Sequence, residues 1–172
     1  MNRTMFSGLR EGTSLNFRDV MSLVPSSVSI LACVSDGKIY GCTISSFVSV
    51  NVIDHDAEII FVLKKGSLVG AKIINDGVFT INVLSSNQEF LARKYSSQRN
   101  PEELPNDNWN TASDKFPQLS NSRASLNCEY MQVYTDHEAD IFVSRVLDFS
   151  GNKDLPALVY DSRKYGMFMS NQ

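Results

Sequence analysis

The chain has 172 residues, a formal net charge of −3 and 42% hydrophobic residues, the composition of a globular domain with a sizeable core. With 16 Lys and Arg against 19 Asp and Glu, it supplies no concentrated basic face, which argues against nucleic acid as a partner. Cys33, Cys42 and Cys128 are an odd number with no close pair, so we expect reduced thiols in a cytoplasmic protein. Neither a signal sequence nor an apolar run of membrane-spanning length is recognisable, so no membrane association is expected.

The first predicted elements are a loose arm, a helix and a hairpin. The arm covers residues 1–13, and a helix with one apolar stripe then begins at Ser14 and ends before Pro25, because proline cannot continue a helix. A strand over residues 28–34 follows and reaches Asp36-Gly37. This pair favours a tight hairpin, because both central turn residues take a positive φ.

The return strand of the hairpin leads into Gly41–Val50, where β-branched and aromatic residues are interleaved with hydroxyl-bearing ones and no charged residue occurs. The hydroxyls belong to Thr43, Ser45, Ser46 and Ser49. Each can donate one hydrogen bond and accept two, so the segment can present polar groups to an uncharged or anionic ligand. An ordinary strand whose serines face water is the alternative.

Strands and helices then alternate. Residues 58–63 form a nearly continuous apolar strand that we expect to be buried on both faces. A helix starts at the N-cap Ser67 and ends at Gly77. Its expected buried stripe is Leu68, Ala71, Ile73 and Ile74. An alternating strand covers residues 79–84, and a capping box over residues 86–89 opens another helix.

Residues 97–124 lose all periodicity and hold three of the five prolines. A segment of this length without regular structure is more often functional than accidental, so we interpret it as a flap. Later strands are predicted at residues 126–134, 141–149 and 157–160. Because few helices separate them, the pattern favours a mainly β fold, an antiparallel barrel with flanking helices formed as one domain by residues 14–172.

Few residues suit metal or covalent chemistry. His55 and His137 lie far apart without partners at ligand spacing, which disfavours a metal site. Cys42 lies in an apolar strand context that raises the pKa of its thiol rather than activating it. No Gly-x-Gly-x-x-Gly follows a strand, so no Rossmann dinucleotide site is expected.

An anion site is better supported at Lys64-Lys65-Gly66-Ser67, where two ammonium groups and a flexible glycine precede a helix N-terminus. The alternative is a solvated lysine pair before a capped helix. A ligand with a polar chain and a terminal phosphate would fit both this turn and the hydroxyl-rich segment. Riboflavin phosphate has that shape.

The pattern Gly-x-Thr-x-Ser-Ser-Phe-x-Ser-Val at residues 41–50 closely resembles the signature of the flavin reductase-like family, small reductases that supply reduced flavin to partner monooxygenases. The resemblance extends over roughly residues 17–168. Leu63–Ser67 is similar to the family's Leu-Asn-x-x-Ser phosphate loop, with Lys64 in place of Asn.

Later motifs follow the same family pattern. Phe79–Leu84 resembles the family's Phe-x-Val-Asn-Val-Leu strand, and Pro156–Tyr160 with Tyr165 resembles its closing motif. One departure concerns a histidine that the family carries near the nicotinamide site, just before an Ile-Phe strand. Ala139 stands at that position, and His137, two residues earlier, is a possible nicotinamide contact.

The resemblance implies an FMN-binding split β-barrel that works as a homodimer. It would be an NAD(P)H:flavin oxidoreductase that passes a hydride from NADH or NADPH to FMN or FAD and supplies reduced flavin to a partner monooxygenase. The ribityl chain and ring edge would be held by Thr43, Ser45 and Ser46, and the phosphate by Lys64 and Ser67, while Tyr165 would close the site. The remaining cofactor-binding positions would be Phe47, Leu63 and Asn82.

Two other interpretations stay open. The missing histidine favours a flavin- or haem-binding split barrel without reductase turnover. A structural barrel with an eroded site is the other.

Overall fold

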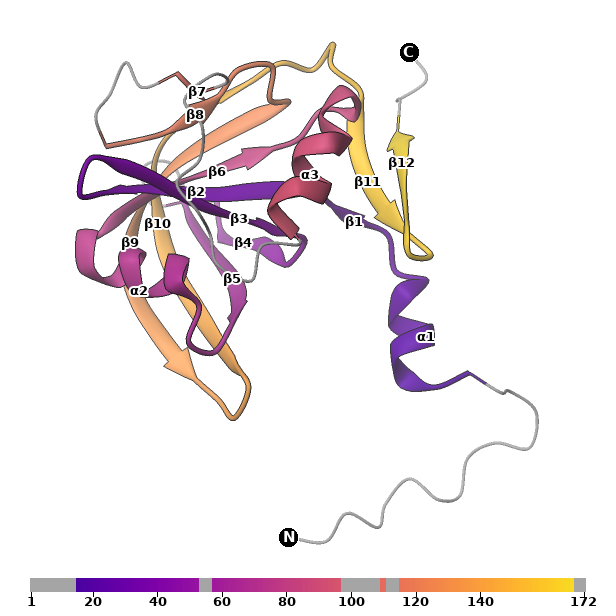
Figure 1. Ribbon diagram of the computed structural model, residues 1–172, viewed down its shortest axis with the longest axis horizontal. Coiled ribbons are helices and arrows are strands. Elements are labelled where there is room, and N and C mark those ends of the chain that lie inside the picture. The colour runs from indigo at the N-terminus through magenta and orange to yellow at the C-terminus, as the bar shows by residue number, and fades with distance from the viewer. Residues whose placement is uncertain (1–14, 53–56, 97–108, 111–114, 169–172) are drawn as a thin grey trace, which may run out of the picture.

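The centre of the structure is an antiparallel sheet of seven strands in the order β3-β2-β6-β9-β10-β5-β4 (Figure 1). This computed structural model describes residues 15–52, 57–96, 109–110 and 115–168. The strands are β2 (Ser29–Ser35), β3 (Lys38–Ile44), β4 (Phe47–Asn51), β5 (Glu58–Lys64), β6 (Val78–Val83), β9 (Ala124–Thr135) and β10 (Ala139–Gly151). The predicted antiparallel β architecture with flanking helices is confirmed.

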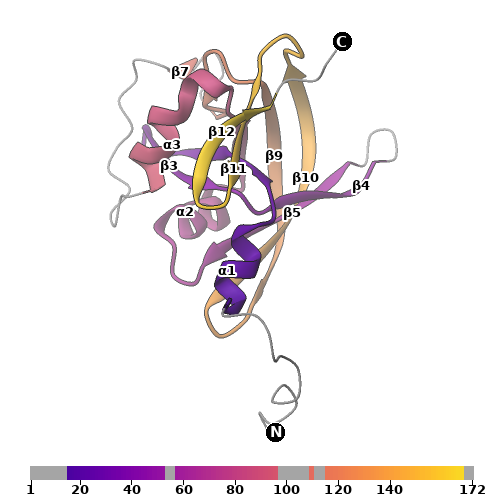
Figure 2. The ribbon, with the colours of Figure 1, turned by 90° about the vertical axis from the view of Figure 1, so that its right-hand side faces the viewer.

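Two small sheets and several short helices complete the described residues. One sheet joins β1 (Ser26–Ser27), β11 (Ala157–Asp161) and β12 (Lys164–Phe168), and the other joins β7 (Trp109–Asn110) and β8 (Gln118–Leu119). The helices are α1 (Phe17–Ser22), α2 (Leu68–Asp76), the 3-10 turn η1 (Ser86–Gln88) and α3 (Glu89–Ser96). Figure 1 shows α1 at the edge of the molecule, and Figure 2 shows it near the β11–β12 hairpin. With nine residues at most, no helix in the described ranges has the length to span a membrane.

Turn residues behave as the sequence predicts. Asp36 and Gly37 join β2 to β3 with φ of 52° and 73°. Gly77 ends α2 in the left-handed conformation, with φ of 80°. The predicted loose arm, most of the predicted flap and His55 lie outside the described residues.

The burial of β5 differs from the prediction. Ile59, Phe61 and Leu63 are buried, but Val62 between them is 38% exposed, so only one face of the strand packs into the core. The strand lies between β10 and β4, and within the described residues no layer covers its outer face. One face of this apolar strand is therefore buried in the core, and the other face is at least partly exposed.

Four other expectations also need correction or qualification. The buried face of α2 is Val69, Gly70 and Ile73, and the helix turns Leu68 and Ile74 outward. The capping box begins one residue earlier, with Ser85 and Gln88. In β6, Phe79 and Ile81 lie in one hydrophobic cluster as the alternation predicts, but Thr80 and Asn82 on the other face are buried as well. α1 forms, but none of its residues is buried, so its apolar stripe has no cover in the described chain.

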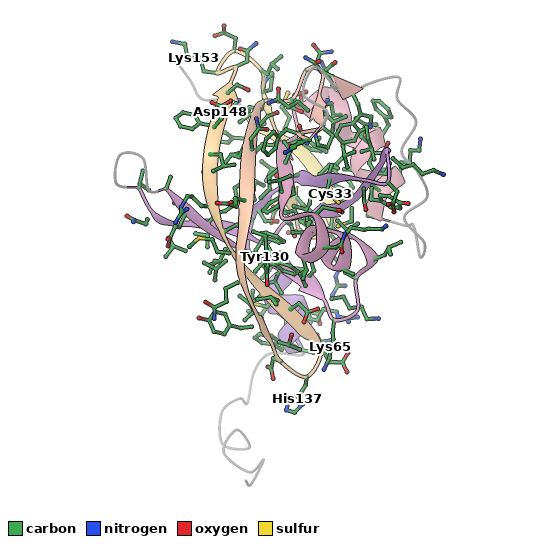
Figure 3. The ribbon with its side chains drawn as sticks, turned by 90° about the vertical axis from the view of Figure 1, so that its left-hand side faces the viewer. Cys33, Lys65, Tyr130, His137, Asp148 and Lys153 are labelled. Atoms are coloured by element: carbon green, nitrogen blue, oxygen red, sulfur yellow. The ribbon has the colours of Figure 1, made fainter. Side chains whose placement is uncertain are left out.

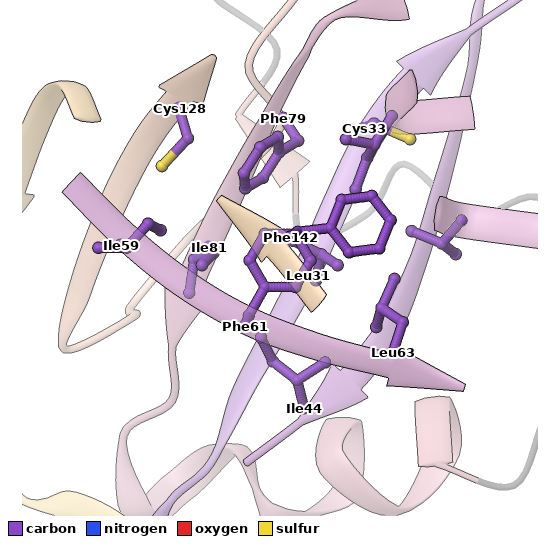
Figure 4. Packing of buried hydrophobic residues seen from close by; sticks show 12 residues of the cluster. Leu31, Cys33, Ile44, Ile59, Phe61, Leu63, Phe79, Ile81, Cys128 and Phe142 are labelled. Carbon is purple, nitrogen blue, oxygen red and sulfur yellow. The ribbon is translucent and has the colours of Figure 1, made fainter. Parts of the chain in front are cut away.

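An aromatic stack forms the middle of one hydrophobic cluster (Figure 4). The rings of Phe61 and Phe142 are stacked with centroids 4.8 Å apart, and Phe79 meets Phe61 edge-on at 5.3 Å. All three side chains are fully buried. A second cluster, on the other face of β2 and β6, packs against α3 and includes Trp109. The two clusters fix where β5, α2 and α3 lie.

Asn82 of β6 connects the sheet to the segment around β8. Its side-chain NH₂ donates to Pro117 O at 3.2 Å and to Ile30 O at 3.5 Å. Its side-chain oxygen accepts from the Leu119 N–H at 2.8 Å and from the Ser125 hydroxyl at 3.1 Å. The amide is therefore fully hydrogen-bonded inside the protein, which accounts for its complete burial.

All three cysteines are free thiols, as predicted. Burial raises the pKa of Cys33, of Cys42 and of Cys128 to about 12 each. A thiol with so high a pKa carries almost no thiolate at neutral pH, so these residues are poor nucleophiles.

We expect Asn82→Ala to lower the free energy of unfolding by roughly 2–4 kcal/mol, because the buried Leu119 N–H and Pro117 carbonyl lose their partner. Denaturant unfolding measures the loss. Asn75→Ala, at an exposed position of α2, is the control and should change stability by less than about 0.5 kcal/mol. Equal stabilities for the two variants would contradict the role of Asn82.

The thiols should also make stability fall at alkaline pH. In the unfolded chain each thiol ionises above its ordinary pKa, whereas the folded chain keeps the proton up to a pKa of about 12. The folded state therefore binds more protons, and each thiol lowers the free energy of unfolding by roughly 1–2 kcal/mol between pH 7 and pH 10. Denaturant unfolding at both pH values should show a smaller loss for Cys128→Ala than for the wild type. An equal loss would refute this assignment.

Candidate functional site

The main cavity lies between the hydroxyl-rich segment and the lysine turn. Its walls are formed by Cys42–Ser46 and by Val62–Leu68, and its volume is about 620 Å³. This size falls within the range of small-molecule sites. Two segments that the sequence analysis selected separately therefore meet at one cavity.

Two hydroxyls fix the wall formed by residues 42–46. Thr43 Oγ1 donates to the carbonyl of Ala92 in α3 at 2.9 Å. Ser46 Oγ donates to the Val62 carbonyl at 3.0 Å and accepts from the Val62 N–H at 3.4 Å. Ser45 between them is exposed, and its hydroxyl has no hydrogen-bond partner among the described residues. Ser45 can therefore serve a ligand as donor or acceptor, whereas Thr43 and Ser46 have only acceptor capacity left.

The opposite end of the cavity suits an anion. Lys64 and Lys65 are exposed, and among the described residues neither forms an ion pair with a carboxylate. Gly66 has φ of 74° and turns the chain into α2, where Ser67 Oγ accepts from the Gly70 N–H at 3.3 Å. The Ser67 hydroxyl proton is still available, and the first N–H groups of the helix point toward the same end.

Three predicted binding residues have other roles for their side chains. Phe47 is half-buried and packs against the aromatic cluster. The Leu63 side chain is 6% exposed and belongs to that cluster, so what this residue mainly offers the cavity is its backbone. Asn82 does not line the cavity, and its hydrogen bonds are all made within the protein, so we leave it out of the site.

Tyr165 lies on the other side of the hydroxyl-rich segment. It lines a smaller hollow of about 260 Å³ with Tyr160 and Ser96, and that hollow shares Thr43, Ile44 and Ser45 with the main cavity. The Tyr165 and Tyr160 rings lie 5.0 Å apart, and the Arg93 guanidinium lies 4.8 Å from the Tyr165 ring. Burial raises the pKa of the Tyr165 hydroxyl, so it stays protonated at neutral pH.

His137 lies on the exposed turn between β9 and β10, and Figure 3 shows it at the same end of the molecule as Lys65. His137 therefore does not lie on a regular strand, as it would have to in order to face the same side as position 139. Ala139 begins β10 and pairs directly with Lys64, while the Lys65 N–H donates to the Glu138 carbonyl at 3.0 Å. The tip of the hairpin thus borders the lysine end of the cavity, a contact for which the sequence carries no local signal.

Metal chemistry finds no support here. Within the described ranges, no group of three or more His, Cys, Asp or Glu side chains is placed to hold an ion. Cys42 lines the cavity, but its raised pKa leaves it protonated. The donor set of the cavity is therefore made of hydroxyls, ammonium groups and backbone N–H groups.

Comparisons with known proteins point to one family. The profile described as "Flavin reductase like domain" matches residues 21–168. The FMN reductase (NADH) RutF of Cronobacter sakazakii is 27% identical over 150 residues, covering 87% of this chain and 89% of the relative. The reductase subunit HsaB of a flavin-dependent monooxygenase from Rhodococcus jostii is 25% identical over 152 residues, covering 88% and 76%.

Solved structures agree on the fold. The styrene monooxygenase flavin reductase SMOB from Pseudomonas putida S12 superposes with a TM-score of 0.78 at 19% identity, covering 91% of this chain and 100% of that chain. The split β-barrel predicted for this protein is the fold of these neighbours. Because the family profile matches most of the chain, this protein belongs to the flavin reductase-like family.

Proposed function

We propose that this protein is an NAD(P)H-dependent flavin reductase whose main cavity binds the flavin. The observation that carries the proposal is that one cavity of about 620 Å³ combines a hydroxyl-bearing wall with two ammonium groups at a helix N-terminus, neither of which pairs with a carboxylate in the described part of the chain. A flavin mononucleotide has the same sequence of groups, a polar ribityl chain that ends in a phosphate. The names of the relatives support this activity.

The polar residues in and beside the cavity have different roles in this proposal. Lys64 supplies charge to the phosphate, and the Ser67 hydroxyl and the first N–H groups of α2 supply hydrogen bonds. The free hydroxyl of Ser45 faces the ribityl chain or the ring edge, while Thr43 and Ser46 hold the wall in place and can accept further hydrogen bonds. Tyr165 bounds the site on the far side of this wall.

Hydride transfer between two cofactors requires no strong base from the protein. When bound, the flavin would supply the ring that accepts a hydride, and the reduced nicotinamide would supply the hydride. The chain orients the two rings and limits access of water to them. This division agrees with the thiols of the chain, which stay protonated at neutral pH and supply no nucleophile.

FMN and NADH are the ligand pair we propose first, because relatives of similar length are named FMN reductase (NADH). FAD and NADPH are the pair to compare with them. Other relatives are named reductase components of monooxygenases or hydroxylases, which supports a partner oxygenase as the consumer of reduced flavin.

The activity is tested by steady-state NADH oxidation in air with riboflavin, FMN or FAD as acceptor. Ser67→Ala removes a hydrogen bond to a charged group, so the KM for FMN should rise by the equivalent of roughly 1.5–3 kcal/mol while that for riboflavin changes little. Lys64→Gln should raise the KM for FMN at low salt more than at high salt.

Lys153→Gln is the matched control, since Lys153 is an exposed lysine at the opposite end of the molecule from Lys65 (Figure 3). It should leave both KM values unchanged. Flavin binding without NADH oxidation would replace the proposal by a carrier function. Equal effects of Ser67→Ala on FMN and riboflavin would remove Ser67 from the phosphate site.

We also propose a homodimer. Register places Val48, Ile60 and Val143 in one row across β4, β5 and β10, and the next row contains Val62, Ile141 and Tyr134. These six side chains lie on the face opposite the aromatic stack, and no described element covers them. A self-complementary contact with a second copy would bury this face, as in most symmetric dimers.

Light scattering should give about twice the chain mass of 19.2 kDa for the wild type. Val143→Glu puts a charge in the middle of the apolar rows and should shift the protein to the monomer. Lys153→Glu, outside these rows, should not. A wild type that is monomeric at micromolar concentration would contradict the dimer.

A further inference from the structure

Gly70 brings α2 unusually close to the core. A Cβ atom built on Gly70 would lie 3.1 Å from Phe142 Cζ and 3.3 Å from Leu63 Cδ1. Contacts this short are tighter than most Cβ contacts in proteins, so a larger residue at position 70 would require its neighbours or the helix to shift by a few tenths of an ångström. Gly70 is buried and lies in the first turn of α2, next to the lysine end of the cavity.

The backbone of Gly70 gives no other reason for glycine. It lies within α2 and does not have a positive φ, unlike Gly66 and Gly77. In such a position glycine is among the least favourable residues for helix stability. Its presence is therefore explained by the space that it leaves, and not by the conformation that it adopts.

The Phe142 ring has little room to move away from Gly70. Phe142 is fully buried and is stacked on Phe61 at 4.8 Å (Figure 4), and it meets the Tyr130 ring at 6.1 Å. Phe61 is held in turn by the edge of Phe79. A side chain at position 70 would meet this stack, and the lower resistance lies in a shift of the helix away from the sheet.

A shift of α2 would displace all of the anion-binding groups at once. The Gly70 N–H donates to Ser67 Oγ at 3.3 Å, and the Ser67 N–H donates to the Lys64 carbonyl at 3.1 Å. The cap, the lysine turn and the helix N-terminus therefore behave as one unit that rests on Phe142 through Gly70.

We propose that Gly70 is a positioning residue, whose missing side chain sets the depth at which the N-terminus of α2 receives the phosphate of the flavin. This inference rests on the proposed function, because it assumes that the cavity binds a phosphate-bearing flavin. Gly70 touches no ligand and acts through Ser67. It determines how strongly the site prefers FMN to riboflavin.

The measured quantity is the ratio of the riboflavin and FMN dissociation constants, obtained from the quenching of flavin fluorescence. Gly70→Ala should lower this ratio about tenfold, equal to about 1.4 kcal/mol, and change the riboflavin constant less than twofold. Phe142→Leu makes room for the new methyl group. The double variant Gly70→Ala/Phe142→Leu should therefore have nearly the same ratio as Phe142→Leu alone.

Val69→Ala is the matched control, because Val69 is a buried neighbour on the same helix whose truncation removes packing without crowding. It should lower thermal stability and leave the ratio unchanged. An unchanged ratio for Gly70→Ala, or a ratio that Phe142→Leu does not restore, would overturn the inference. If the wild type itself binds riboflavin and FMN equally, the phosphate site of the proposed function fails instead.

Discussion

The site depends on one crossing of the chain, from β3 at one edge of the seven-stranded sheet to β4 at the other. Ser45 and Ser46 alone lie between these strands, so the crossing passes close to the end of β5. The Ser46 hydroxyl holds it to the backbone of Val62, and the Thr43 hydroxyl holds β3 to α3. Hydroxyls are short and can donate and accept at once, which suits them to fix a backbone at such close range.

The hydroxyls at this crossing therefore differ in use: some hold the backbone of the cavity wall in place, and others can face a ligand. The hydroxyls of Thr43 and Ser46 donate to backbone carbonyls, whereas the Ser45 hydroxyl has no hydrogen-bond partner among the residues that the structure describes. The family pattern contains all three residues, and pattern alone cannot tell these uses apart. A hydroxyl that fixes the crossing supports binding indirectly, because its loss would move the wall on which the free hydroxyl of Ser45 stands.

The sequence predicted features that local chemistry decides. The Asp36-Gly37 hairpin and the Ser67 cap follow from backbone conformation and capping preference, and the structure contains both. Features decided by distant contacts were missed. The buried face of α2 depends on how Gly70 meets Phe142, and the burial of Asn82 depends on a segment 35 residues away in the chain. Strand β12 was also missed, because short edge strands carry little periodic signal.

The position of the cavity walls and the charge at the end of the cavity therefore depend on different parts of the molecule. Phe61 of β5 stacks on Phe142 of β10, and α2 packs closely against Phe142 at Gly70. The exposed rim of the cavity, Lys64 and Lys65, determines which charge a ligand would meet there. The β9–β10 hairpin joins this rim through a backbone hydrogen bond, from the Lys65 N–H to the Glu138 carbonyl. Because this contact uses no side chain, it leaves both lysine ammonium groups at the cavity. We therefore expect a change at Lys64 or Lys65 to remove one donor, and a change in the stack to displace the cap, the helix N-terminus and the lysine turn together.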